Sequence, residues 1–141
     1  MTRKNLNGLY NAISLNKKKD DMKKRKEIIN SARADVVISI HMNSHVLNES
    51  KGAQVFYSQN SENSMILAEK IQDIFITSLP NARKEALVGD YYILNCSNIP
   101  SVIVECGYLS NPEEEMLLQN EEYMNKICAC IFLGVVKYLT A

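Results

Sequence analysis

The chain has 141 residues, 46% of them hydrophobic, and a formal net charge of zero at pH 7. This length and composition suit one domain with a sizeable core. No apolar run approaches the roughly 18 residues that cross a bilayer, and residues 1–14 lack the apolar segment of a signal peptide, so we expect a soluble, unexported chain without a membrane segment.

The charge is unevenly distributed along the chain. Residues 1–34 hold ten Lys and Arg against three acids, a net charge of +7, and residues 35–141 hold six against thirteen, a net charge of −7. A basic segment can attract nucleic acid or a polyanionic wall polymer. A solvated helix face beside a lysine-rich loop is the simpler interpretation, so we predict no nucleic-acid partner.

The first half of the chain alternates between helical and strand patterns. Leu15, Met22 and Ile29 recur every seven residues and predict a helix over 19–33. The unbroken apolar run ADVVISI, residues 34–40, follows it and predicts a strand buried on both faces, as in a parallel sheet. After Gly52, the stretch AQVFYS predicts a second strand.

The second half continues the alternation. A helical face begins near Ser61 and is stopped by Pro80. YYILN at 91–95 and SVIVE at 101–105 are two further strand candidates, and an apolar stripe from Tyr123 to Tyr138 predicts a long terminal helix. Strands alternating with helices indicate an α/β layer fold.

The four cysteines show no metal-binding or redox spacing. Cys128 and Cys130 are two residues apart, and on a helix they would point in different directions. We interpret these two, with Cys96 and Cys106, as small buried hydrophobic residues in a reducing compartment, without a disulfide or metal role.

Two apolar runs finish in a protonatable residue. VVISI runs into His41, and SVIV runs into Glu105. Ligands of open α/β sheets bind beyond the carboxyl ends of the strands, so neighbouring strands would bring this imidazole and this carboxylate into one crevice. The pair suits a metal site with an acid–base group, and it equally suits a structural hydrogen bond.

The residues around this pair resemble a known family. SIHMN at 39–43, followed by IPSVIVECGYLSNPEE at 99–114, is similar to the zinc-dependent N-acetylmuramoyl-L-alanine amidases of the type-3 amidase family, and most similar to the germination-specific spore-cortex amidases. Shorter matches at 1–3, 8–10, 51–58 and 117–123 extend the resemblance over nearly the whole chain. It implies a twisted, mixed but mostly parallel sheet flanked by helices.

The resemblance also implies roles for individual residues. His41 would be a zinc ligand, and Glu105 would be the base that takes a proton from zinc-bound water. The reaction would hydrolyse the amide between the lactyl group of muramic acid and L-alanine in peptidoglycan. Zinc lowers the pKa of its bound water towards neutrality and stabilises the oxyanion.

Several neighbours are candidates for supporting roles. Asn43 and Asn111 could orient a ligand or bind substrate, although asparagine after a strand is also ordinary turn chemistry. Gly107 would let the backbone turn close to the crevice, or serve as a plain turn glycine. Tyr108 stands where the family usually has phenylalanine, so we expect it to pack in the core. His45 has no counterpart in the motif, and we expect a surface loop residue.

The resemblance also indicates what this chain lacks. Family members begin with a strand and a glycine-rich turn whose histidine is the first zinc ligand, and the following helix carries a glutamate as the second. Residues 1–141 are therefore expected to be the C-terminal two-thirds of one catalytic domain, incomplete at the N-terminus, with two of three zinc ligands absent. Lys4 and Asn5 also stand where an acidic residue is common.

This expected gap has physical consequences. A chain with one ligand should bind zinc weakly at best and show little amidase activity alone. A missing strand would expose a sheet edge, which favours self-association or a need for an accessory protein.

The family's substrate places the protein on the cell-wall or cortex side of the membrane of a spore-forming bacterium, although the visible chain shows no export signal. Two alternatives remain open: a non-catalytic peptidoglycan-binding remnant, and a generic α/β interaction domain.

Overall fold

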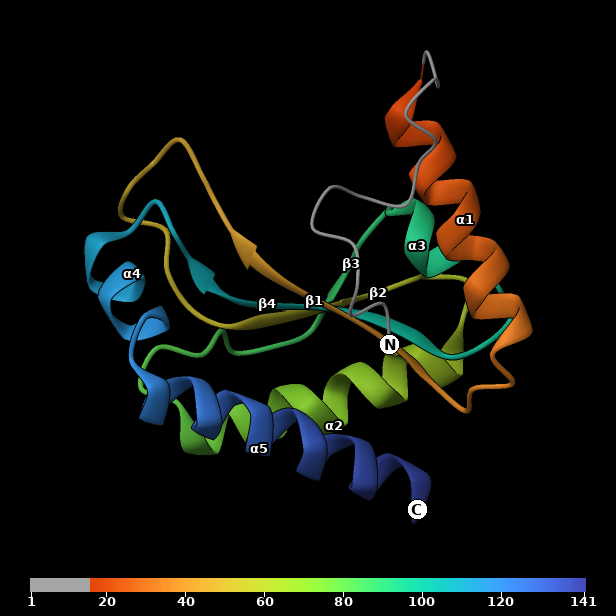
Figure 1. The fold of residues 1–141 in the computed structure, drawn as a ribbon. Helices are drawn as coiled ribbons and strands as arrows, with labels where there is room; N and C mark the ends of the chain where they lie inside the picture. Colours follow the sequence, from red (N-terminus) through yellow and green to blue (C-terminus); the bar gives the residue numbers. More distant parts are fainter. Residues whose placement is uncertain (1–15) are drawn as a thin grey trace.

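The computed structural model describes residues 16–141, which form a four-stranded sheet with helices on both faces (Figure 1). The elements in chain order are α1 (Lys17–Ser31), β1 (Val37–Asn43), β2 (Gln54–Tyr57), α2 (Glu62–Ser78), β3 (Leu87–Val88), α3 (Tyr92–Asn95), β4 (Ser101–Tyr108), α4 (Pro112–Leu118) and α5 (Glu121–Leu139). None of the helices within 16–141 is long and apolar enough to span a membrane.

The sheet has the strand order β1-β4-β2-β3. β1 pairs with β4 in parallel, β2 pairs with β3 in parallel, and β2 pairs with β4 in antiparallel orientation. This confirms the mixed, mostly parallel sheet flanked by helices. β4 lies between two neighbours, and all of its eight residues except Glu105 are buried, as expected of a central strand.

The main core lies between one face of the sheet and the helices α2 and α5. Side chains of a β-strand alternate between faces, so Val102, Val104 and Cys106 of β4 share one face and join this core. α2 begins at the predicted Ser61, whose hydroxyl accepts a hydrogen bond from the Ser64 backbone N–H at 3.2 Å. The predicted helices at 61–80 and near the C-terminus are confirmed.

The opposite face of the sheet lies towards α1 and α3 (Figure 1). Phe56 of β2 meets the Tyr91 ring edge-on, with centroids 5.9 Å apart. Ile103 and Glu105 alternate with the core residues of β4 and therefore belong to this face, together with their register partners on β1, Ser39 and His41. The polar residues of the central strands are thus confined to one side of the sheet.

The strand predicted at 91–95 is wrong, because Tyr92–Asn95 form the short helix α3. The Asn95 amide donates a hydrogen bond to the Tyr91 carbonyl at 3.2 Å, closing the turn. Leu94 is buried whereas Tyr92 is 51% exposed. A short apolar run is compatible with a helical turn as well as with a strand, and here the local hydrogen bonds stabilise the helix.

The burial predicted for both faces of the first strand is also wrong. β1 begins three residues later than predicted and lies at the edge of the sheet formed by residues 16–141. No residue of β1 is fully buried, and Ile40 is 58% exposed. An apolar run therefore indicated a strand here but not its number of neighbours.

The structure also differs from the sequence predictions at α1, β3, α4 and one of the four cysteines. The helix predicted over 19–33 is α1, but it buries no residue completely, and Leu15 of the proposed stripe lies outside the described residues. β3 and α4 were not predicted, although Asn111 followed by Pro112 is a typical helix start. All four cysteines are free, as predicted, but Cys128 is exposed rather than buried.

Gly134 lets α5 approach α2, and replacing it tests this close packing. A Cβ at position 134 would lie 2.6 Å from Cα of Ile71. Overpacking costs about 1–3 kcal/mol, more than the gain of about 1 kcal/mol that alanine brings to a helix. We therefore expect Gly134→Ala to lower the free energy of unfolding by up to about 2 kcal/mol in urea denaturation. The exposed control Asn125→Ala should be neutral or stabilising, and equal effects of the two changes would contradict this packing.

Candidate functional site

His41 and Glu105 are direct partners across the parallel pair of β1 and β4. Residues paired in register project from the same face of a sheet. The expectation that neighbouring strands bring this imidazole and this carboxylate together is therefore met. Gln54 is the partner of Glu105 on the other side, and its amide donates to the Glu85 carbonyl at 3.1 Å.

His41 is exposed and held by a short contact. Its Nε2 lies 2.7 Å from the hydroxyl oxygen of Ser39, two residues earlier on the same face of β1. Either group can donate in this hydrogen bond, depending on the tautomer. The contact limits the orientation of the imidazole while its Nδ1 forms no hydrogen bond within the described residues.

Glu105 is partly buried, and one of its oxygens has no partner. Oε2 is inaccessible to solvent and forms no hydrogen bond within residues 16–141. Burial raises the pKa of Glu105 above the ordinary value of a glutamate, and the neighbouring His41 opposes part of this rise. An orphaned buried carboxylate oxygen is unfavourable for folding alone, which makes it a marker of function.

The strand end beyond His41 is irregular. The register between β1 and β4 shifts between His41 and Asn43, so Asn43 pairs with Tyr108. The Asn43 side chain accepts a hydrogen bond from the Ser44 backbone N–H at 2.8 Å, which is ordinary turn chemistry. Bulges of this kind redirect side chains at the ends of strands.

The donor atoms at this site suit zinc in kind but do not complete its coordination. Imidazole nitrogen and carboxylate oxygen are typical zinc ligands, and Oε2 of Glu105 has no hydrogen-bond partner within residues 16–141. Within residues 16–141, however, no three His, Cys, Asp or Glu side chains come together as a metal site. A catalytic zinc normally takes three protein ligands.

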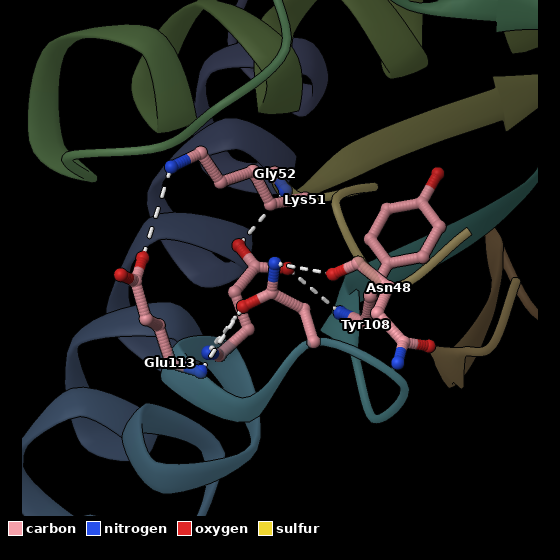
Figure 2. Close-up of polar contacts among 7 residues, drawn as sticks. Asn48, Lys51, Gly52, Tyr108 and Glu113 are labelled. Atoms are coloured by element: carbon pink, nitrogen blue, oxygen red, sulfur yellow. Dashed lines mark hydrogen bonds and ion pairs between the residues drawn. The ribbon is translucent and has the colours of Figure 1, made fainter.

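Glu114 of α4, which the sequence analysis missed, supports the backbone beside the site. Its side chain is 2% exposed, and its two oxygens accept hydrogen bonds from the backbone N–H groups of Gly52 and Tyr108, each at 2.8 Å. Figure 2 shows both bonds converging on one carboxylate. They join the end of β4 to the loop before β2, and no basic side chain within residues 16–141 pairs with this carboxylate.

Asn111 belongs to the same support. Its carbonyl oxygen caps α4 by accepting from the N–H groups of Glu113 and Glu114, at 3.0 and 3.2 Å, and its amide donates to the Asn48 carbonyl at 2.9 Å. Asn111 is 6% exposed. These contacts attach the loop that follows β1 to the helix that follows β4.

Gly107 and Tyr108 also have structural explanations. Gly107 has φ +153°, and a Cβ there would lie 3.2 Å from a carboxylate oxygen of Glu114. Tyr108 is 8% exposed, and the Arg83 guanidinium carbon lies 5.8 Å from its ring centroid. The prediction that Tyr108 packs in the core is confirmed.

His45 lies in the exposed loop after β1. Its ring Nδ1 accepts a hydrogen bond from the Leu47 backbone N–H at 3.1 Å, and the backbone N–H of His45 donates to the Ser110 hydroxyl at 3.0 Å. These contacts fit the predicted loop residue and leave His41 as the imidazole beside Glu105.

Comparison with known proteins adds independent information. Residues 1–137 match the family model described as N-acetylmuramoyl-L-alanine amidase. The germination-specific N-acetylmuramoyl-L-alanine amidase of Bacillus subtilis is 33% identical over 125 residues, which are 88% of this chain and 53% of that protein. The chain thus spans about half the length of this curated relative.

Solved structures share the fold. The CwlD amidase from Clostridioides difficile, in complex with the GerS lipoprotein, is 35% identical with a TM-score of 0.90 over 98% of this chain and 73% of that chain. The catalytic domain of CwlV from Bacillus (Paenibacillus) polymyxa is 28% identical with a TM-score of 0.78 over 86% of this chain and 69% of that chain. Both neighbours share the fold of this chain over the matched part.

Replacing Glu105 should stabilise the metal-free chain in a pH-dependent manner. The folded-state pKa is raised, so the parent's stability is complete below the unfolded pKa of about 4.3 and declines as pH rises through the folded pKa. Glu105→Gln avoids this decline. We expect its thermal midpoint to match the parent near pH 4 and to exceed it near pH 7, measured with a chelator present. Exposed Glu49→Gln should show no such trend, and a lower midpoint for Glu105→Gln at pH 7 would contradict the expectation.

Glu114→Gln tests the support formed by α4. A glutamine has one acceptor oxygen, so one of the two backbone N–H groups would face the amide nitrogen and lose its partner. An unsatisfied buried donor costs about 1–3 kcal/mol, and we expect urea denaturation to show a loss of that size. The adjacent Glu113 is the control, because its carboxylate is exposed and lies 3.7 Å from the Lys51 ammonium. Glu113→Gln should change stability by less than about 0.5 kcal/mol.

Proposed function

Because the chain belongs to the type-3 N-acetylmuramoyl-L-alanine amidase family, we propose that it is a zinc-dependent peptidoglycan hydrolase. The bond cleaved is the amide between the lactyl group of N-acetylmuramic acid and L-alanine of the stem peptide. The observation that carries the proposal is the register pairing of His41 with Glu105, whose buried Oε2 has no partner within the described residues.

His41 is the proposed metal ligand. It would bind through its imidazole, with Ser39 limiting the ring's orientation. Bound zinc lowers the pKa of a coordinated water and polarises the substrate carbonyl. The remaining ligands would come from outside residues 16–141, which fits the proposal that residues 1–141 are the C-terminal two-thirds of one amidase domain.

Glu105 is the proposed general base. Its buried Oε2 has no hydrogen bond to break within the described residues, so the carboxylate would be free to turn and accept the proton of an attacking water. A carboxyl with a raised pKa holds this proton more readily and can return it to the leaving amine of L-alanine. Burial of the carboxylate thus serves both proton transfers.

Asn43, Gly107 and Asn111 are proposed to act indirectly. The hydrogen bonds of Asn111 and Asn43 shape the loop after β1, and Gly107 permits the close approach of Glu114 to the end of β4. They would hold His41 and Glu105 in place rather than contact the reacting atoms.

The similar proteins suggest a biological setting. We propose action on the cell wall or spore cortex of a spore-forming bacterium, because the Bacillus subtilis relative is germination-specific. An accessory protein is a proposed partner, since the Clostridioides difficile amidase was solved in complex with a lipoprotein.

A non-catalytic peptidoglycan-binding domain is the second candidate. The incomplete set of metal ligands within residues 16–141 favours it. It predicts sedimentation with peptidoglycan that a chelator does not affect and no cleavage at all.

The test compares the two histidines in the protein as its host cell makes it. His41→Ala should weaken zinc binding at least about tenfold and abolish the release of L-alanine amino termini from peptidoglycan, whereas His45→Ala should preserve both. Glu105→Gln should keep zinc and lose the release of amino termini. Equal zinc affinity of the His41 and His45 variants, or full activity of Glu105→Gln, would refute the assignment.

A further inference from the structure

A cavity of about 570 Å³ lies against the face of the sheet that carries His41. Ser39, His41 and Ile103 contribute to it from β1 and β4, and residues 90–93 contribute from the loop and helix at α3. α1 supplies the remaining lining residues: Lys18, Asp21, Met22 and Arg25. This volume is in the range of about 300–1,000 Å³ that small ligands occupy.

The α1 residues at this cavity form one face of the helix. Positions 18, 21, 22 and 25 follow the spacing of three and four residues that brings side chains to the same side. The other basic residues of α1 do not line this cavity. Lys18 and Arg25 are therefore the two cations of α1 that line the cavity beside His41.

Arg25 is oriented by a neighbour in a manner that suits a carboxylate. Its Nε lies 2.6 Å from Oδ2 of Asp21, whose side chain is only 16% exposed, whereas that of Arg25 is 42% exposed. This bond uses Nε and leaves both terminal nitrogens of the guanidinium without a hydrogen bond among the described residues. Two parallel N–H groups bind a carboxylate in a bidentate manner.

The other charged groups and the apolar surface of the cavity narrow the type of ligand. Asp21 is paired with Arg25, and Asp90 is exposed at the rim on the α3 side. Lys18 forms no ion pair within residues 16–141. Met22 and Ile103 add apolar contacts. A short peptide with a free carboxylate and small apolar side chains matches this mixture better than an uncharged sugar does.

We propose that this cavity receives the peptide side of the substrate, with a carboxylate of the peptide bound by Arg25 and assisted by Lys18. The proposal rests on the proposed amidase function, because it assigns the two sides of the scissile bond to different surfaces. The peptide would lie between α1 and the sheet beside His41, and the glycan would extend beyond the carboxyl ends of β1 and β4. Arg25 would then be a specificity-determining residue.

The test measures peptide binding without requiring catalysis. The probe is the dipeptide L-alanyl-D-glutamate, in which the carboxyl of alanine is joined to the amine of glutamate, titrated by NMR into chelator-treated protein. We expect shifts at residues lining the cavity and weaker binding of the same dipeptide with both carboxylates converted to amides. Arg25→Gln should weaken binding of the acidic dipeptide at least about tenfold, the scale of one charge-assisted contact.

Matched variants separate a bidentate contact from a general charge effect. Lys24→Gln removes one charge from the same helix outside the cavity and should leave the affinity unchanged. Arg25→Lys keeps the charge without the planar fork and should bind with intermediate affinity. Equal binding by Arg25→Gln and the parent, equal binding of the amidated dipeptide, or the absence of dipeptide binding would overturn the proposal. Displacement of the dipeptide by the disaccharide of N-acetylglucosamine and N-acetylmuramic acid would place the glycan in the cavity and would also overturn it.

The failure of one proposal can be distinguished from the failure of the other. Amidase activity without dipeptide binding would reject the peptide cavity alone. Carboxylate-dependent dipeptide binding with no cleavage of peptidoglycan by the host-produced protein would reject the amidase function alone.

Discussion

The structure depends on the pairing of β4 with a neighbour on each side. Because both edges of β4 are hydrogen-bonded, its register is fixed against β1 and β2 at the same time. A shift of one residue would turn Val102 and Val104 away from α2 and α5 and turn Glu105 into the core. The burial of aliphatic side chains on one face therefore determines where the carboxylate stands on the other.

The segment after β4 solves a second problem, which is how to end a buried strand. The backbone leaves the regular pattern near Gly107, and the loop before β2 contains Gly52, whose φ is +108°. N–H groups in such irregular, buried backbone need acceptors. Glu114 supplies one oxygen to Gly52 and one to Tyr108, so a single side chain stabilises two chain segments. The motif that resembles the amidases thus contains the proposed base, Glu105, and a structural carboxylate nine residues later.

The two faces of the sheet differ, because one holds the hydrophobic core and the other holds the candidate site. α2 and α5 cover the side that holds the hydrophobic core, and α5 approaches closely because Gly134 has no side chain. The side towards α1 and α3 keeps His41 exposed and includes the cavity with Arg25. α1 buries no residue completely, so its lysines are solvated as the simpler interpretation of the basic segment expected. Only Lys18 and Arg25 among its cations also meet the cavity beside His41.

The sequence by itself determined the α/β class, the strands at β2 and β4, the helix starting at Ser61 and the two candidate site residues, His41 and Glu105. These features depend on local patterns: the period of apolar residues, capping side chains and the residue that ends a run. Tertiary structure decided the rest. The fold of 91–95 and the exposure of β1 depend on neighbours that a local pattern does not contain. In the sequence, Glu114 is one of three consecutive acids. Its carboxylate has a role only in the folded chain, where it binds the backbone of Gly52 and Tyr108, which are 62 and 6 residues away in sequence. Contacts between distant segments are formed by the whole chain, so a short window of sequence cannot specify them.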